Sequence, residues 1–427
     1  MRVGIGILGG GNVGGSLARK LLTERPAIAA KSGLDLHLVR VAVRSLGKPR
    51  PVDLPAELLS DRPMEVVDDP EVQLVVELMG GSDPARELIL RALDQGKPVV
   101  TANKELVAAD GLELIRRAEA KGVSLLFEAA VGGGIPILRP LSESLAGERL
   151  TRVLGIVNGT TNYILTSMEE ESRTYQAVLA EAQRLGYAEA DPTADVSGAD
   201  AAAKAAILAS LAFGTWVGSD RVHREGIESI QLRDLAFARR LGYVVKLLAV
   251  AEETPDGVGA RVHPALVPAT HPLASVRGAY NAVFVEGPAV GRLLFSGPGA
   301  GGEPSATAVL GDVIEAAREL VSGVQVAPRV RFAPGKLVDF ADARTKWYLR
   351  VEVVDRPGVL AQIAGVFGSH DVSIMSVWQE GRGDGATVLL VTHDAPESSH
   401  RAAVEELGGL EVVQQVAATI RVVTDEP

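Results

Sequence analysis

The sequence predicts an α/β protein with three parts: a discontinuous, doubly wound parallel sheet, an inserted α+β domain and a C-terminal ferredoxin-like domain. Short apolar runs alternate with helical patterns up to about residue 130, which is typical of a parallel sheet covered by helices. Glycine-rich loops, alternating strands and two long helices then replace that pattern. The chain ends in a β-α-β-β-α-β order, and its 427 residues suffice for two or three separate cores.

The first strand, 3–8, runs into a glycine turn that is followed by a helical pattern. The turn is Gly9-Gly10-Gly11-Asn12-Val13-Gly14, which fits the G-x-G-x-x-G fingerprint. The three glycines of that fingerprint allow a tight turn, close approach of a pyrophosphate, and close helix–strand packing. A purely structural turn is the alternative. The position between a strand and a helix favours a Rossmann-type dinucleotide site, with helix N–H groups facing the phosphates.

The second strand, 36–44, ends at Arg44, where an NAD-specific enzyme usually carries an acid for the ribose hydroxyls. A guanidinium at that position suits a 2′-phosphate, and Lys48 and Arg50 lie just beyond it. The sequence therefore favours NADP, with NAD as the alternative. A solvated surface arginine is the other interpretation of Arg44.

Further strands are expected at 74–78, 98–102 and 123–128, with helices at 84–93 and 106–120. Polar groups follow two of these strands at the carboxyl edge, where such sheets bind ligands. Gly81 and Ser82 are therefore candidate cofactor-binding residues. Lys104 follows the other strand and is a candidate catalytic and cofactor-binding residue, although most lysines in such positions are solvated.

The inserted domain is expected to contain four strands and to close with a glycine-rich loop at 296–302. The helix after that loop, 305–322, is expected to return to the first domain. The predicted boundaries are 1–130 plus 305–325 for the dinucleotide domain, 131–304 for the substrate and dimerisation domain, 326–345 for a linker and 346–427 for the C-terminal domain. The four strands are predicted at 150–157, 243–252, 259–268 and 282–287.

Composition excludes several classes of function. The net charge of −11 argues against nucleic acid as a partner, and the absence of cysteine removes disulfides, thiolate metal sites and cysteine nucleophiles. An aldehyde substrate would therefore be interconverted with an alcohol by direct hydride transfer. There is no apolar run of about 18 residues and no signal-peptide pattern, so we expect a cytoplasmic protein without a membrane partner. The histidines show no metal-ligand spacing, and no G-x-S-x-G elbow is present.

The strongest chemical signal is a pair of charges on an otherwise apolar helix that follows an acidic loop. Asp200 and Lys204 are separated by four residues, so they share one face, and Ile207 and Leu211 fall in the same sector. The remaining helix positions are mostly alanine. An exposed ion pair worth about 0.3–0.5 kcal/mol is the alternative. A helix that is apolar all round is buried, however, and buried charges need a partner or a ligand.

The run from Ala182 to Lys204, A-x3-G-Y-A-x2-D-P-x2-D-V-x-G-x-D-x3-K, resembles the signature of the homoserine dehydrogenase family. Four other stretches are similar to the family and occur in its order, and the resemblance extends to about residue 325. The last part, from Tyr348 to Leu360, is similar to an ACT domain, a module that binds amino acids. The four stretches that are similar to the homoserine dehydrogenase family are Asn158–Leu165, Thr101–Lys104, Phe127–Pro136 and Gly297–Gly302.

The resemblance implies a role for each residue that matches the signature. Lys204 matches the proton donor to the carbonyl oxygen. Asp200 and Glu189 match acids that hold the ammonium and hydroxyl of homoserine, and we include Asp195 with them as a substrate-binding acid. The implied reaction is the reversible reduction of L-aspartate 4-semialdehyde to L-homoserine, on the route to threonine, methionine and isoleucine.

The resemblance also implies binding partners. Gly186 and Gly302 match glycines beside the cofactor, and Lys104 matches a lysine near cofactor and substrate. A monovalent cation, Na⁺ or K⁺, would be held by backbone carbonyls of a loop that sequence alone indicates only as a glycine-rich turn. The four matching residues are Glu128, Val131, Gly133 and Ile135. Family members are usually dimers or larger, so a homodimer or homotetramer is expected.

The ACT-like part implies feedback inhibition by threonine, although 355–358 also suits a simple β-turn. Two other functions remain as hypotheses. One is a different Rossmann dehydrogenase with an appended sensor, against which the run from Glu189 to Lys204 argues. The other is a binding protein without turnover, whose ligand behaviour would not change on replacing Lys204.

Overall fold

The computed structural model describes residues 2–323, 329–381 and 385–424. The chain divides into two compact units, each assembled from several segments. The first unit comprises 1–150, 206–220 and 281–334, and the second comprises 151–205, 221–280 and 335–427. Within the described residues, no helix is both long enough and apolar enough to cross a bilayer.

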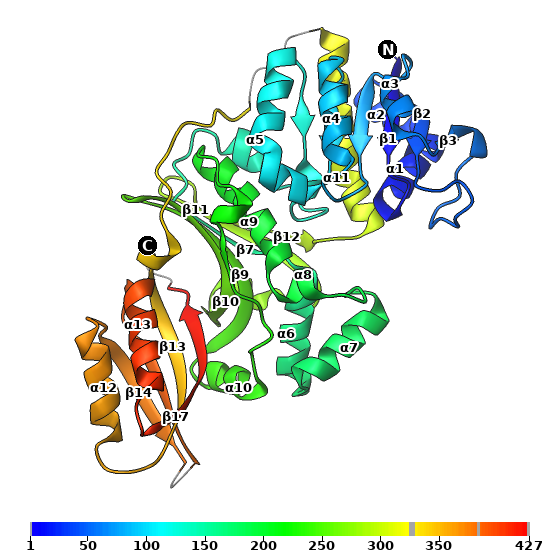
Figure 1. The fold of residues 1–427 in the computed structure, drawn as a ribbon. Helices are drawn as coiled ribbons and strands as arrows, with labels where there is room; N and C mark the ends of the chain where they lie inside the picture. Colours follow the sequence, from blue (N-terminus) through cyan, green and yellow to red (C-terminus); the bar gives the residue numbers. More distant parts are fainter. Residues whose placement is uncertain (1, 324–328, 382–384, 425–427) are drawn as a thin grey trace. The chain divides into compact units, whose positions relative to one another are not determined.

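The first unit is built on a six-stranded parallel sheet with the order β3-β2-β1-β4-β5-β6 (Figure 1). The first strand is the middle of the sheet, and the chain winds outward from it in both directions, as expected for a doubly wound fold. The strands are β1 (Arg2–Leu8), β2 (Asp35–Ala42), β3 (Leu59–Ser60), β4 (Leu74–Glu77), β5 (Val99–Thr101) and β6 (Leu125–Leu126).

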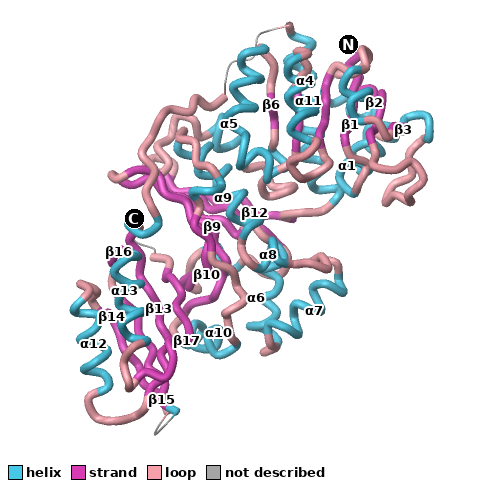
Figure 2. Tube along the Cα trace, in the orientation of Figure 1, coloured by secondary structure: helices cyan, strands magenta, loops and turns pink. Residues whose placement is uncertain are grey.

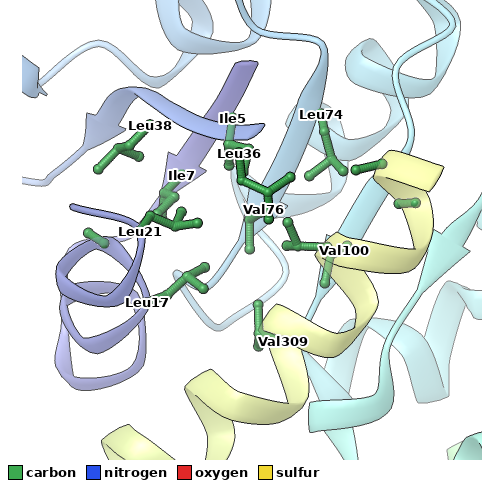
Figure 3. Close-up of a cluster of buried hydrophobic side chains, with 14 of the residues drawn as sticks. Ile5, Ile7, Leu17, Leu21, Leu36, Leu38, Leu74, Val76, Val100 and Val309 are labelled. Carbon is green, nitrogen blue, oxygen red and sulfur yellow. The ribbon is translucent and has the colours of Figure 1, made fainter. Parts of the chain in front are cut away.

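Helices cover both faces of this sheet, because successive side chains of each buried strand point to opposite faces. Ile5 and Ile7 of β1 pack with the helices α1 and α11, which form one layer (Figure 3). Leu8 at the end of the same strand packs with α3, α4 and α5 on the other face. The helices are α1 (Asn12–Thr23), α2 (Arg25–Ser32), α3 (Pro63–Asp68), α4 (Ala85–Asp94), α5 (Lys104–Lys121) and α11 (Gly302–Ser322).

The packing of α11 explains why the first unit is discontinuous. Val309 and Val313 of this late helix are fully buried against residues of β1, β4 and β5, so the helix completes one layer of the parallel sheet. The strands β11 (Tyr280–Gly287) and β12 (Gly291–Pro298) precede it and lie next to each other in one sheet. The domain boundaries themselves stay predictions.

The second unit contains a mixed sheet with the order β7-β9-β10-β17-β13-β15-β14. Helices α6 to α8 and the first part of α9 belong to it, and α10 contacts both β9 and α6. Its elements before residue 280 are β7 (Arg152–Ile156), α6 (Gly159–Glu171), α7 (Tyr175–Leu185), α8 (Thr193–Val196), α9 (Ala199–Phe213), β8 (His223–Arg224), α10 (Leu232–Arg240), β9 (Tyr243–Thr254) and β10 (Gly257–Pro268).

The C-terminal domain has the predicted β-α-β-β-α-β order, with a two-residue strand, β16, added before the second helix, and its two helices pack on the sheet (Figure 2). Its sheet continues that of the second unit, because Ala265 and Leu266 of β10 pair with Arg421 and Val422 of β17. The elements are β13 (Arg344–Val353), α12 (Val359–Ser369), β14 (Ile374–Glu380), β15 (Ala386–Thr392), β16 (Ala395–Pro396), α13 (Glu397–Gly408) and β17 (Val413–Val422).

Several details differ from the predicted elements. The strand expected at 123–128 is only two residues long, because the carboxylate of Glu128 accepts backbone N–H groups of residues 137–139 and draws the chain out of the sheet. Strand β12 was not predicted; its alternate exposed positions leave it without a continuous apolar run. It extends to Pro298, into the segment that was expected to be a loop, and α11 begins at Gly302 instead of residue 305.

Candidate functional site

The glycine turn after β1 has the geometry that its three glycines predict. Gly9 has a φ of +109°, which a residue with a side chain rarely adopts. A Cβ on Gly14 would lie 1.9 Å from the carbonyl oxygen of Gly9, so only glycine lets α1 start this close to the strand. A Cβ on Gly11 would meet no atom within 4 Å. The backbone at Gly11, which caps α1, is therefore open to the approach of a phosphate.

The start of α11 lies beside the same turn. A Cβ on Gly302 would be 3.0 Å from both the carbonyl oxygen of Asn12 and the Oγ of Ser16. The next residue, Glu303, forms an ion pair with Arg19 and lies 3.2 Å from the Nζ of Lys20. The structure thus brings the predicted Gly302 to the first turn of α1, although the two are far apart in the sequence.

Arg44 lies two residues after the end of β2, in the exposed loop 44–49. Arg50 closes this loop by donating hydrogen bonds to the carbonyl oxygens of Ser45 and Leu46. The guanidinium of Arg44 is exposed at the carboxyl edge of the sheet, where a charged group of a dinucleotide would be expected.

A buried carboxylate joins the ends of β4 and β5. Glu77 is fully buried and accepts hydrogen bonds from the Met79 backbone at 2.7 Å and from the Thr101 hydroxyl at 2.6 Å. Asn103 donates from Nδ2 to the carbonyl oxygen of Gly81 at 2.7 Å and caps helix α5, which begins at Lys104. These bonds fix the backbone around two predicted residues, Gly81 and Lys104, while Ser82 is exposed.

Asp195, Asp200 and Lys204 meet in the second unit; we call these three residues the acid–lysine cluster. The Nζ of Lys204 lies 2.6 Å from the Oδ2 of Asp200 and 2.8 Å from the carbonyl oxygen of Val157. The Nδ2 of Asn158 lies 2.6 Å from Asp195 Oδ1 and 2.9 Å from Asp200 Oδ2. The Lys204 and Asp200 side chains are 12% and 10% exposed, so they are not the surface ion pair that their spacing alone would allow.

The acid–lysine cluster carries more negative than positive charge, since two carboxylates surround one ammonium. Burial raises the pKa of Asp195, and the nearby charge of Asp200 raises it further, whereas the hydrogen bond from Asn158 opposes the change. Partly buried carboxylates in this arrangement are stabilised by an added cation. The cluster therefore suits a ligand that brings an ammonium group.

The loop that carries Gly186 and Glu189 is tied to the start of α6. Gly186 ends helix α7 with a φ of +79°, and the next carbonyl oxygen, that of Tyr187, accepts a hydrogen bond from the Thr160 hydroxyl at 2.6 Å. The rings of Tyr187 and Tyr163 are 4.7 Å apart. The side chain of Glu189 is exposed, in contrast to the three members of the acid–lysine cluster.

The turn predicted to hold a cation lies in the first unit. Two glycines with positive φ, Gly132 and Gly133, bend the chain between Val131 and Ile135. The Glu128 carboxylate accepts the backbone N–H groups of residues 137–139, and its backbone N–H donates to Asp312 at 2.8 Å. Its carboxylate therefore shapes the turn through hydrogen bonds to the backbone.

Sequence reasoning did not assign roles to Asn158 or Glu77. Asn158 precedes a helical pattern, so its sequence signal indicates an N-cap, and it does cap α6. Its contacts with two acids from α8 and α9 depend on tertiary structure. Glu77 ends a buried strand, where an unpaired acid would be unfavourable. An acid at that position indicates that its carboxylate has hydrogen-bond partners.

Three family models match the chain. The homoserine dehydrogenase model matches residues 136–314, the NAD-binding domain of homoserine dehydrogenase matches 9–128, and the ACT domain matches 347–412. The homoserine dehydrogenase of Corynebacterium glutamicum is 47% identical over 428 residues, covering 99% of this chain and 96% of the relative. That of Mycobacterium tuberculosis is 48% identical over 430 residues, covering 98% and 97%.

Solved structures agree with these relatives. A homoserine dehydrogenase from Thiobacillus denitrificans superposes with a TM-score of 0.92 at 40% identity, covering 99% of this chain and 98% of that one. A hyperthermophilic archaeal homoserine dehydrogenase in complex with NADPH has a TM-score of 0.63 at 29% identity, covering 78% and 100%. Full-length similarity of this degree, together with the glycine turn and the acid–lysine cluster, means that the chain belongs to the homoserine dehydrogenase family.

Proposed function

We propose that this enzyme reduces L-aspartate 4-semialdehyde to L-homoserine reversibly, with Lys204 as the proton donor. The observation that carries the proposal is the largely buried contact between Lys204 and Asp200. A buried ammonium beside a carboxylate on an apolar helix is a functional candidate, and the family supplies the reaction.

The residues divide the chemical work between them. When bound, the nicotinamide cofactor supplies or accepts the hydride. Lys204 stabilises the negative charge that grows on the carbonyl oxygen and donates the proton, which is general acid catalysis. Asp200 orients Lys204 through their 2.6 Å contact and, together with Asp195 and Glu189, provides negative charge for the substrate ammonium. The resemblance to the family supports a role for Lys104, at the start of α5, beside the cofactor.

Purified protein tests this function directly. We expect it to oxidise NADPH with aspartate semialdehyde, and to reduce NADP⁺ with L-homoserine at alkaline pH, because oxidation of the alcohol releases a proton. Turnover of other small aldehydes without an α-amino group should be much weaker, because the acid–lysine cluster then lacks its cationic partner. An absence of turnover with both substrates would contradict the proposal.

We also propose that backbone carbonyls of Glu128, Val131, Gly133 and Ile135 hold Na⁺ or K⁺. The sharp turn through two positive-φ glycines supports the idea, since it lets successive carbonyls converge. The nearby carboxylate of Glu128 adds favourable negative charge. Burial raises the pKa of Asp312 to about 7, and a bound cation would favour its ionised form. The same assay in KCl, NaCl or choline chloride at constant ionic strength tests the proposal.

The exposed guanidinium of Arg44 supports a preference for NADPH, because it is suited to a 2′-phosphate. Arg44→Asp should lower kcat/KM for NADPH at least about tenfold, which corresponds to the loss of roughly one charge-assisted hydrogen bond. The same variant should have a higher kcat/KM for NADH. The ratio of kcat/KM values for the two cofactors measures this change. Lys31→Asp, at the end of α2, is the control for charge reversal alone. An unchanged ratio would exclude a role for Arg44 in cofactor binding.

We propose that threonine inhibits the enzyme through the ACT domain, and a chain of contacts supports a route for that signal. Arg421 of β17 forms a bidentate pair with the buried Glu397 and also binds Glu225. Burial alone would raise the pKa of Glu225, but the hydrogen bond with His223 and the charge of Arg421 outweigh it and lower that pKa to about 2. Glu225 is therefore charged and bound at neutral pH.

The segment after Glu225 contacts the turn between α8 and α9. The backbone N–H of Ile227 donates to the carbonyl oxygen of Val196 at 2.9 Å. A Cβ on Gly226 would lie 2.2 Å from that same oxygen, and a Cβ on Gly198 would lie 3.2 Å from the carbonyl oxygen of Glu225. A shift of β17 would therefore reach the turn that separates Asp195 from Asp200.

Glu225→Gln should weaken inhibition by threonine at least about fivefold, the lower end of ordinary allosteric coupling, with little change in uninhibited kcat. Arg421 keeps both bonds to Glu397, so the ACT domain should remain folded. The measurement is a threonine titration of initial rates. Glu380→Gln is the matched control, because Glu380 pairs with Arg240 between the same two parts of the second unit but at the surface. Equal inhibition of both variants would exclude this route, and a wild-type enzyme insensitive to threonine would exclude the effector.

A further inference from the structure

Asn158 occupies the junction between β7 and α6, where it contacts two elements that are distant in the sequence. Its Nδ2 lies within hydrogen-bond distance of Asp195 on α8 and Asp200 on α9. Its neighbour Val157 accepts the hydrogen bond of Lys204. All three members of the acid–lysine cluster are therefore held by two consecutive residues of the β7–α6 junction.

The orientation of the Asn158 amide is determined by its surroundings. Its Oδ1 accepts the backbone N–H of Thr161 at 2.9 Å and lies 2.9 Å from the Thr161 hydroxyl. Only an oxygen can accept the backbone N–H, so the NH₂ group must point to the two acids, which accept but do not donate when ionised. The residue is 5% exposed, so the amide has little contact with bulk water.

We propose that Asn158 is a positioning residue, which bridges Asp195 and Asp200 so that Asp200 holds Lys204 and both acids face the substrate ammonium. Two carboxylates this close repel each other, and the shared NH₂ group offsets that repulsion by donating one hydrogen to each. Asp200 Oδ2 then accepts from both Asn158 and Lys204, which restricts its rotation and fixes the direction of the ammonium. This inference rests on the proposed function of the cluster.

Asn158→Asp separates positioning from folding. An aspartate still caps α6 through an oxygen, because Asn and Asp are equally good N-caps, but it removes both donated bonds and adds a third carboxylate beside Asp195 and Asp200. We expect kcat/KM for aspartate semialdehyde to fall at least about thirtyfold, between the losses typical of one and two charge-assisted hydrogen bonds, with KM for NADPH within about twofold.

The pH profile supplies a readout that a structural role would not move. The added negative charge favours the protonated form of Lys204, so the limb of homoserine oxidation that requires the free amine should move to higher pH. Asn158→Ser, which keeps a capping oxygen without adding charge, should lower kcat/KM without that displacement. Thr174→Ala removes the N-cap of α7 instead and controls for lost helix capping, with kinetics unchanged.

The outcomes distinguish this inference from the proposed function. Normal kinetics and an unmoved pH profile in both Asn158 variants, with Lys204→Met inactive, would overturn the positioning role and leave the proton donor intact. If Asn158→Asp is too unstable to assay, Asn158→Ser alone decides, and wild-type kcat/KM in that variant would also overturn it. A wild-type enzyme without turnover would contradict the proposed function itself.

Discussion

Lys204→Met is expected to lower kcat at least about a hundredfold, in the range of general acid catalysis, while the protein stays folded and binds NADPH. Methionine keeps most of the side-chain volume in a site that is only 12% exposed, and Asp200 retains its hydrogen bond from Asn158. The decrease in kcat can then be attributed to the missing proton donor and its positive charge. Initial rates in both directions measure it, with cofactor fluorescence and circular dichroism as checks on binding and folding.

Lys204→Arg separates charge from proton transfer. Arginine keeps the positive charge but does not deprotonate in proteins, so it can stabilise the developing oxyanion but can neither give up a proton during reduction nor accept one during oxidation. We expect both directions to be slowed together, because the equilibrium constant fixes the ratio of their kcat/KM values, and to be less impaired than in Lys204→Met, which lacks the charge as well. Lys336→Met, at a side chain that is 73% exposed, controls for the loss of a lysine elsewhere. Wild-type kcat in Lys204→Met would exclude this residue as proton donor.

Much of the fold could be predicted because local pattern and tertiary environment agree. The strand–glycine turn–helix start and the β-α-β-β-α-β end are confirmed, since their apolar runs have the length and spacing of buried strands and helices. Strand β12 was missed for the opposite reason. Its exposed and half-buried positions alternate without a buried face, so its pairing with β11 depends on backbone hydrogen bonds rather than on side-chain pattern.

In the candidate site, too, local features could be predicted from the sequence and long-range contacts could not. The position of Asp200 and Lys204 on an apolar helix follows from a spacing of four residues, and their mutual contact is local. Asn158 is separated from Asp200 by 42 positions, and Gly302 lies beside Asn12 only because α11 returns to the parallel sheet. Such long-range contacts leave no periodic signal in a single sequence. The roles assigned to these residues remain predictions until variants are measured.

Arg350→Met is expected to lower the free energy of unfolding by about 3–5 kcal/mol, the usual cost of breaking a buried ion pair. Arg350 of β13 and Asp234 of α10 are both 0% exposed, and the guanidinium Nε lies 2.7 Å from the carboxylate. Methionine would leave Asp234 buried, with its backbone bond from Gln231 as the remaining described partner. Urea unfolding followed by circular dichroism measures the change, with Glu380→Gln as the exposed-pair control, expected to cost less than about 1 kcal/mol.

The double variant Asp234→Leu with Arg350→Met decides whether the pair stabilises the fold or only avoids an unpaired charge. Apolar residues of similar volume commonly replace a buried ion pair without loss, so the double variant should recover most of the stability that the single variant loses. Glu352 keeps its bonds from Arg233 and Thr387 in that background and would not be left unpaired. A double variant as unstable as Arg350→Met would show instead that the guanidinium itself, with its bonds to Gln231 and Glu352, joins the ACT domain to α10. In that case a specific polar contact, and not only the avoidance of an unpaired charge, would hold the ACT domain against α10.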